Sequence, residues 1–129
     1  MKISKKRDGV YIVDGEEYVY SEYDNTLANE NEVLLPGSIE TANQSEDDPS
    51  IILTIDEIAE ELMEGENQRK GQAYFNALMQ VCPSLAGRLR GGPTDPFYRD
   101  ELVDAFVCDI TLKVTPDELI EFQNKIKEV

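Results

Sequence analysis

A two-residue turn constrains the fold at the N-terminal end of the chain. Asp14-Gly15 lies between two short runs rich in Val, Ile and Tyr, and Asp-Gly tolerates the positive backbone dihedral angles of a type I′ hairpin turn. The register that follows places Tyr11 opposite Tyr18. Because strand side chains alternate between faces, one face of the hairpin holds Val10, Ile12 and Val19, and the other holds Tyr11, Tyr18 and Tyr20 with Val13 and Glu16. The tyrosine face is typical of cross-strand packing, although exposed tyrosines would also suit a contact surface.

Beyond the hairpin, the apolar spacing becomes that of helices. A capping box at Thr54-Ile55-Asp56-Glu57 predicts a helix that ends at Gly65. Residues 68–90 predict a long helix or a pair of helices interrupted by Pro83. Asp95-Pro96 indicates another helix start, and Thr115-Pro116-Asp117-Glu118 repeats the capping box before a terminal helix. Residues 109–114 alternate between polar and apolar side chains and therefore predict a strand.

These elements predict an α+β fold, with an N-terminal antiparallel hairpin or small sheet packed against three to five helices. A length of 129 residues favours a single domain, 1–129. Within it we expect a β-rich region over residues 1–37, an acidic loop over 38–50 and a mainly helical part over 51–129. The strand near 109–114 could extend the sheet. The acids of the loop could bind a hard cation such as calcium, but they lack EF-hand spacing and are more typical of a solvated loop.

Charge is segregated along the chain. Residues 8–68 carry many carboxylates and no Lys or Arg, whereas residues 69–99 carry a single acid, Asp95, and five basic side chains: Arg69, Lys70, Arg88, Arg90 and Arg99. The net charge of −15 argues against binding bare nucleic acid or an anionic membrane surface. In the helix predicted from Thr54, acids line the outside without a basic partner four residues away, so like charges repel. This arrangement favours an electrostatic role toward a positively charged partner.

Composition excludes several kinds of chemistry. The chain has no histidine, which excludes Ser-His and Cys-His nucleophile activation and any metal site that needs imidazole. Two cysteines are too few for a structural zinc site, and we expect them to be reduced, with a disulfide as the alternative. No nucleophile motif or glycine-rich phosphate loop is present, so the sequence predicts no enzyme, no metal and no cofactor. No apolar run is long enough to span a membrane and no hydrophobic signal region follows the N-terminus, so we expect a cytoplasmic protein (host cytoplasm if phage-encoded).

One segment resembles other proteins. Its pattern consists of Gly71-Gln72, an Asn-x-Leu at 76–78, a Pro-x-Leu at 83–85 and Asp95-Pro96-Phe97-Tyr98. Residues 68–107 are thereby similar to a group of short bacterial and phage proteins with no assigned activity. Gly91-Gly92-Pro93-Thr94 stands where that group has Gly-Thr. The resemblance implies a compact helical unit and a microbial or phage origin, and it implies no site.

The leading functional hypothesis is a non-catalytic binding protein whose acids occupy a basic, nucleic-acid-handling site on a protein partner. Its concrete form is a phage inhibitor that mimics DNA, such as an anti-CRISPR or anti-restriction protein. The candidate contact residues are Asp56, Glu57, Glu60, Glu61 and Glu64, supported by Glu16, Glu17, Glu22 and Asp24. The alternative is an acidic structural or interaction protein without an inhibitory role, which could form homo-oligomers through its tyrosine-bearing hairpin. Direct nucleic-acid binding through the basic segment 69–99 is a third possibility, and we do not expect it.

Overall fold

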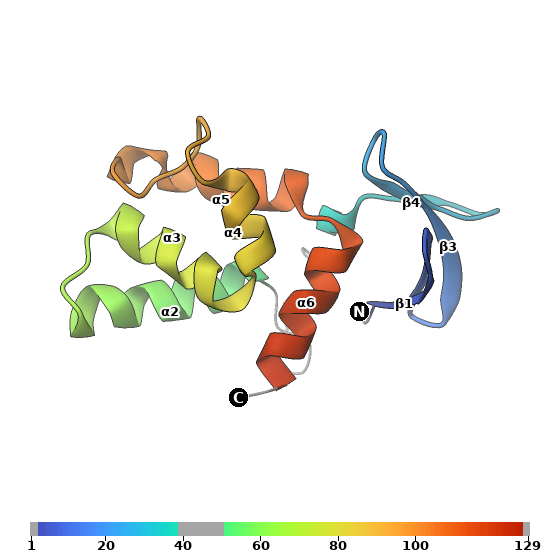
Figure 1. Ribbon diagram of the computed structural model, residues 1–129, viewed down its shortest axis with the longest axis horizontal. Coiled ribbons are helices and arrows are strands. Elements are labelled where there is room, and N and C mark those ends of the chain that lie inside the picture. Colours follow the sequence, from blue (N-terminus) through green and yellow to red (C-terminus); the bar gives the residue numbers. More distant parts are fainter. Residues whose placement is uncertain (1–2, 39–50, 128–129) are drawn as a thin grey trace.

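The N-terminal part of the chain forms a five-stranded antiparallel sheet (Figure 1). The computed structural model describes residues 3–38 and 51–127. The strands are adjacent in chain order: β1 (Ile3–Arg7), β2 (Val10–Val13), β3 (Glu16–Ser21), β4 (Thr26–Ala28) and β5 (Val33–Leu34). Asp14 and Gly15 both have positive φ, 51° and 86°, as a type I′ turn requires. The predicted hairpin register is confirmed, with Tyr11 opposite Tyr18 and Val13 opposite Glu16.

The tyrosine face of the sheet is buried against the helical part. Tyr11 and Tyr18 are 3% and 2% exposed, and Leu27, which lies opposite Tyr20, is fully buried. The Tyr11 hydroxyl donates a hydrogen bond to Asp117 Oδ1 at 2.7 Å, and burial together with this acceptor raises the pKa of Tyr11 above its ordinary value. The packing interpretation of this face is therefore confirmed, and its interpretation as an exposed contact surface is wrong.

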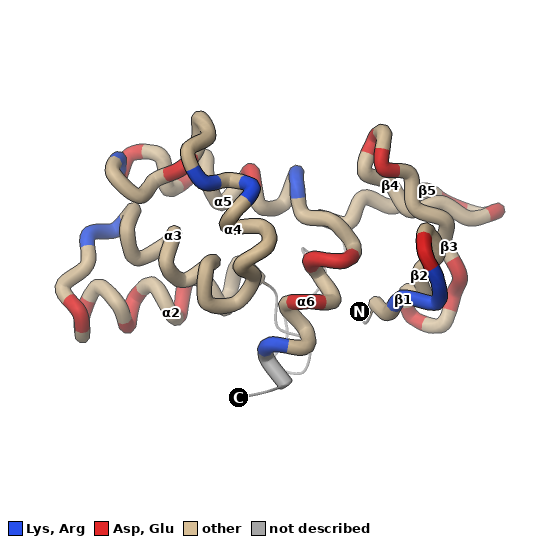
Figure 2. The backbone as a smooth tube through the Cα atoms, viewed as in Figure 1, with Lys and Arg blue, Asp and Glu red and all other residues tan. Residues whose placement is uncertain are grey.

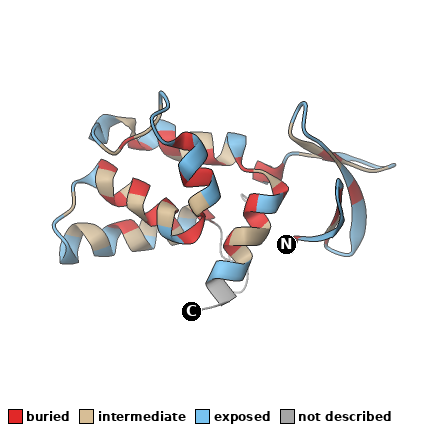
Figure 3. Cartoon of the chain, viewed as in Figure 1, coloured by how far each residue is buried: buried red, intermediate tan, exposed pale blue. Residues whose placement is uncertain are grey.

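Five α-helices follow within the described residues, and they lie on the same side of the sheet (Figure 1). They are α2 (Ile51–Gly65), α3 (Lys70–Val81), α4 (Pro83–Leu89), α5 (Val103–Lys113) and α6 (Pro116–Lys127), with a 3₁₀ turn η1 (Asp100–Leu102) before α5. Residues 36–38 are also helical. Helix α6 contacts β1 on one side and α3 on the other, so it lies between the sheet and the remaining helices (Figure 1). Buried residues occur on β1–β4 and on each of the five helices (Figure 3). The molecule is a single α+β domain, as predicted.

Two local predictions at helix ends are confirmed. The chain breaks between α3 and α4 at Pro83, which is the first residue of α4. At the start of α6, Thr115 N–H donates to Glu118 Oε1 at 2.9 Å, and Glu118 N–H donates to Thr115 Oγ1 at 3.3 Å. This reciprocal pair is a capping box.

Other predictions were wrong. Residues 109–113 belong to helix α5, so no strand there extends the sheet; β1, β4 and β5 do so instead. Helix α2 already includes Ile51, so Thr54 lies inside it. Asp95-Pro96 starts no helix, because the Asp95 carboxylate closes a turn by accepting hydrogen bonds from the N–H groups of Gly91 and Phe97. The predicted acidic loop falls outside the described residues apart from Ser38.

Candidate acidic interface

The outer face of α2 carries a row of carboxylates. Glu57, Glu60, Glu61 and Glu64 are all exposed, and their spacing of three and four residues places them on one side of the helix. In the described part of the chain, none of the ion pairs involves any of these four. We call these four residues the α2 acidic face.

The position of these carboxylates in the helix lowers the stability of the folded state. The last turn of α2 carries no basic residue, although the C-terminal end of a helix is its negative end. Glu61 and Glu64 therefore lie where the helix dipole disfavours an anion, by typically 0.3–1 kcal/mol per charge. Like charges three and four residues apart add roughly 0.2–0.5 kcal/mol per pair. The sequence keeps an arrangement that folding alone would disfavour.

Asp56 differs from the other predicted α2 residues. It is only partly exposed and accepts a hydrogen bond from the Tyr74 hydroxyl at 2.8 Å, which joins α2 to α3. Burial, reinforced by Asp56, raises the pKa of Tyr74 to about 12. The carboxylate of Asp56 is thus occupied within the fold, and we do not include it in the α2 acidic face.

The hairpin acids lie at the opposite end of the molecule from α2 (Figure 2). Glu16, Glu17, Glu22 and Asp24 are exposed. Glu17 forms an ion pair with Lys6, whose hydrogen bond and charge lower the pKa of Glu17. Asp24 accepts a hydrogen bond from Thr26 at 2.7 Å, and hydrogen bonds from Thr26 and Ser21 lower its pKa. The structure therefore does not bring the nine predicted contact residues together in one continuous surface.

Several cations of the basic segment have partners within the chain. Arg69 forms an ion pair with Asp100 at 3.4 Å and donates to the carbonyl of Phe97 at 2.7 Å. Arg99 pairs with Glu101 at 2.9 Å, and the Arg90 guanidinium lies 5.7 Å from the centre of the Phe75 ring. These partners offset part of the positive charge of the segment, while the side chains of Arg69 and Arg99 remain 49% and 66% exposed.

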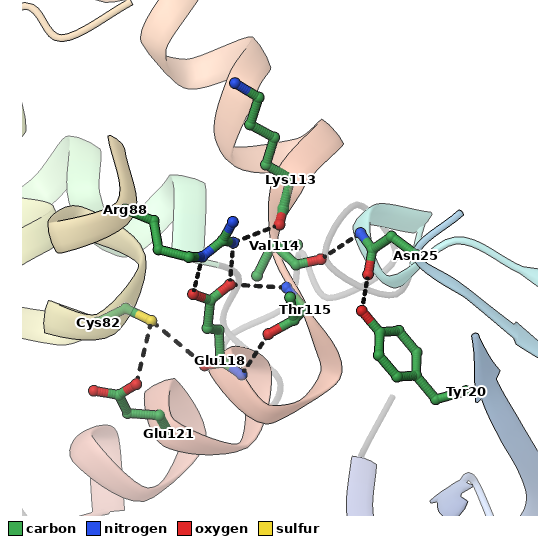
Figure 4. A network of polar contacts seen from close by, with 9 residues as sticks. All are labelled: Tyr20, Asn25, Cys82, Arg88, Lys113, Val114, Thr115, Glu118 and Glu121. Atoms are coloured by element: carbon green, nitrogen blue, oxygen red, sulfur yellow. Dashed lines mark hydrogen bonds and ion pairs between the residues drawn. The ribbon is translucent and has the colours of Figure 1, made fainter. Parts of the chain in front are cut away.

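Arg88 belongs to a polar network that the sequence did not reveal (Figure 4). Its Nε and Nη2 atoms donate to the two oxygens of Glu118 at 2.8 and 2.6 Å, and Nη2 also donates to the Lys113 carbonyl at 2.7 Å. The hydrogen bond to Glu118 raises the pKa of Arg88.

The Cys82 thiol lies near this network. It is buried and free, and burial raises its pKa to about 12. A thiol with that pKa stays protonated near neutral pH and is a poor nucleophile.

A second exposed feature lies beside Val19 and Ala28, which the register places on the face of the sheet opposite the buried tyrosines, and it includes Glu16 from the tyrosine face. A hollow of about 500 Å³ is lined by Glu16, Glu17, Val19, Ala28, Asn29, Glu30 and Asn31. Sequence reasoning placed Val10, Ile12 and Val19 on this face but gave it no role. The sequence contained part of the information needed to predict this hollow, because the hairpin register already placed Val19 on the face opposite the tyrosines. The contribution of Ala28 and of the turn at 29–31 depends on β4, which the sequence did not predict.

Comparisons with known proteins supply no relative. The chain matches no family model, no curated protein and no solved structure.

In the described ranges 3–38 and 51–127, no helix combines the length and the apolar character needed to cross a membrane. The same ranges contain no group of three or more Cys, Asp or Glu side chains arranged to hold a metal ion.

Proposed function

We propose that this protein is a non-catalytic acidic binding protein whose α2 acidic face docks on a basic surface of a partner that handles nucleic acid. The observation that carries the proposal is the set of four exposed carboxylates on one side of α2, which have no ion-pair partner among the described residues. A solvated helix face normally mixes in cations at i,i+4 positions. The absence of such relief is expected if the cations come from another molecule.

Charge spacing supports a basic nucleic-acid site as the target. With a rise of 1.5 Å per residue, Glu57 and Glu64 are separated by about 10 Å along the helix axis. One DNA strand presents a charge roughly every 3.4 Å, so about 10 Å spans three intervals and about four phosphates. Four carboxylates over that distance match a strand in charge density. A groove lined with Arg and Lys reads mainly charge and position, so it would accept this face.

The proposal is restricted to α2. The hairpin acids lie at the other end of the molecule (Figure 2), so a single compact basic site would not contact both groups. The alternative is a homo-oligomer formed through the tyrosines of the hairpin. Tyr11 and Tyr18 are buried and therefore offer no exposed surface for such contacts. We place the activity in the cytoplasm, where the free thiols Cys82 and Cys108 would stay reduced. An inhibitor of a defence nuclease is the specific form of the proposal.

Capture from a bacterial lysate tests the proposal. The immobilised protein should retain a basic nucleic-acid-binding protein at low salt, and both added duplex DNA and high salt should release it, because the two ligands would share one site. The triple variant Glu57→Lys, Glu60→Lys and Glu64→Lys should lose the captured protein. Its residual binding should depend less steeply on salt.

A matched variant separates local contact from net charge. Reversal of Glu101, Asp104 and Glu22, which are exposed and lie outside α2, changes the net charge by the same amount. This variant should retain the partner. Equal loss from both variants would show that only overall charge matters, and unchanged capture by the α2 variant would refute the proposal.

A further inference from the structure

The face of the sheet opposite the tyrosines carries an apolar row that crosses several strands. In the register, Val19 lies opposite Ala28, and Ala28 lies opposite Val33. Val19 and Val33 are 61% and 66% exposed, although β-branched side chains at such positions normally pack against a neighbour. The small side chain of Ala28 between two valines leaves a depression in this row. An aliphatic side chain from another molecule would fit there.

The depression opens into the hollow lined by Val19, Ala28 and the β4–β5 turn. The turn is held in shape by Asn29, whose Oδ1 accepts the backbone N–H groups of Asn31 and Glu32 at 2.8 and 2.9 Å. The Asn29 backbone N–H also donates to the Glu32 carbonyl at 3.0 Å. The wall of the hollow is therefore built before any ligand arrives, and its volume of about 500 Å³ is within the usual range for binding pockets.

The rim of the hollow is acidic. Glu16, Glu17 and Glu30 line it together with the apolar residues, and all three are exposed. Glu17 is paired with Lys6 of β1, and Glu16 accepts a hydrogen bond from the Tyr18 hydroxyl at 3.2 Å. This leaves Glu30, on the side of the β4–β5 turn, without an ion pair among the described residues. A ligand for this site should therefore combine an aliphatic group with a positive charge.

We infer that the outer face of β3–β5 binds an extended segment of a partner protein in which aliphatic residues alternate with lysine or arginine. Alternation sends the aliphatic side chains of an extended chain to one side, where they would cover Val19, Ala28 and Val33. The cationic side chains at the edges would reach Glu17 and Glu30. This surface is separate from the α2 acidic face, so the inference does not depend on the proposed function.

A second copy of this chain is a poor occupant by comparison. Each copy carries a net charge of −15, and two such molecules repel one another. A basic segment instead gains from the same charge. The occupant is thus chosen by charge complementarity as well as by the apolar row.

Two capped peptides of equal charge test the inference. Lys-Val-Lys-Val-Lys supplies both features, and Lys-Gly-Lys-Gly-Lys supplies the charge alone. We expect the dissociation constant of the valine peptide to be at least about tenfold lower than that of the glycine peptide. Burial of the two valine side chains of the peptide against the sheet would allow a difference of this size. In NMR titrations, the amide signals of Val19, Ala28 and Asn29–Asn31 should move with the valine peptide and stay nearly unchanged with the glycine peptide.

Matched substitutions locate the contact. Val19→Thr keeps a β-branched residue in the strand and should remove most of the preference for the valine peptide. Leu112→Gln removes a similarly exposed aliphatic side chain, 69% exposed, from α5 and should leave the preference intact. The triple α2 variant described above should also keep the preference, which separates this test from that of the proposed function.

Three results would overturn the inference. The two peptides could bind equally well, which would leave charge as the sole cause of binding. The valine peptide could instead move only signals of α2, which would place its binding site away from the sheet. Sedimentation could instead reveal a dimer that Val19→Thr dissociates, and the face would then be an interface between copies of this chain.

Discussion

The carboxylate of Glu118 is nearly buried, and its hydrogen bonds are made to groups of the same chain. Its side chain is 7% exposed, whereas that of its partner Arg88 is 45% exposed. The carboxylate accepts hydrogen bonds from the Arg88 guanidinium and from the backbone N–H of Thr115, so it joins α4 to the corner between α5 and α6 (Figure 4). A second arm of the network runs from the carbonyl of Val114 to Asn25 at 3.0 Å and on to Tyr20 at 2.7 Å. The corner is thereby tied to the sheet as well.

Removal of Glu118 should therefore destabilise the protein strongly. Glu118→Ala removes a helix cap and charged hydrogen bonds, and we expect a loss of about 2–3 kcal/mol in the free energy of unfolding, measured by urea denaturation. The matched control is Glu101→Ala, because Glu101 also pairs with an arginine at 2.9 Å but is 64% exposed. That change should leave stability nearly unaltered. Similar losses for both variants would mean that burial does not set the strength of these pairs.

At the level of elements, a close approach fixes how α3 meets the segment before η1. A Cβ atom on Gly71 would lie 1.9 Å from the carbonyl oxygen of Pro96, a backbone atom. The same junction is closed by Asp100, whose Oδ1 accepts the Gly71 N–H at 3.0 Å. Arg69 contacts both sides of the junction through Asp100 and the Phe97 carbonyl.

Two glycine-to-alanine changes separate this packing effect from helix propensity. In a helix, Ala is normally more stable than Gly by about 1 kcal/mol. Gly87→Ala in α4 meets no atom within 4 Å and should gain roughly that amount. Gly71→Ala should instead lose about 1–3 kcal/mol, as overpacking typically does. Thermal unfolding of the two variants checks both signs, and a gain at Gly71 would show that the junction can move apart freely.

Elements were predictable from sequence where one local signal was sufficient. Asp14-Gly15 specified the hairpin, and the Thr115–Glu118 box specified the start of α6, because each depends on residues within one turn. Residues 109–114 show why other elements failed. Their alternation is a short pattern of period two, but the buried residues Val103, Phe106, Ile110 and Val114 follow a helical spacing that begins before the window. Leu112, which the strand prediction placed beside Ile110, is exposed in α5.

The candidate site was predictable only in part for a related reason. The acids of α2 repeat at helical spacing, so their shared face could be predicted from α2 alone. Their relation to the hairpin acids depends on how α6 separates the sheet from the other helices (Figure 1), which no local pattern encodes. The use of Asp56 by Tyr74, and of Arg88 by Glu118, likewise depends on contacts between distant elements.

The whole molecule combines a strongly negative net charge with acids at both of its ends. Ion pairs such as Lys6–Glu17 relieve the hairpin end in part, whereas the α2 acidic face has no such relief among the described residues. Long-range repulsion should therefore work against folding, and most strongly at low ionic strength. Screening shortens the reach of these charges from about 30 Å at 0.01 M salt to about 10 Å at 0.1 M.

Stability should accordingly rise with salt. We expect the midpoint of thermal unfolding to increase between about 0.01 M and 0.1 M NaCl, because repulsion between carboxylates is screened. The α2 triple variant, in which three Glu become Lys, provides the comparison. It should be more stable than the natural chain at low salt, because the substitutions lower the magnitude of the net negative charge, place a cation in the last turn of α2 and give Glu61 neighbours of opposite charge at positions 57 and 64. Positions 57, 60 and 64 remain like-charged with one another, so the gain comes from these three effects, and the midpoint should depend less on salt. A midpoint that falls with salt in the natural chain would mean that internal ion pairs outweigh the repulsion. A variant that gains stability yet loses its captured partner would show that the α2 acidic face is kept for binding at the expense of folding.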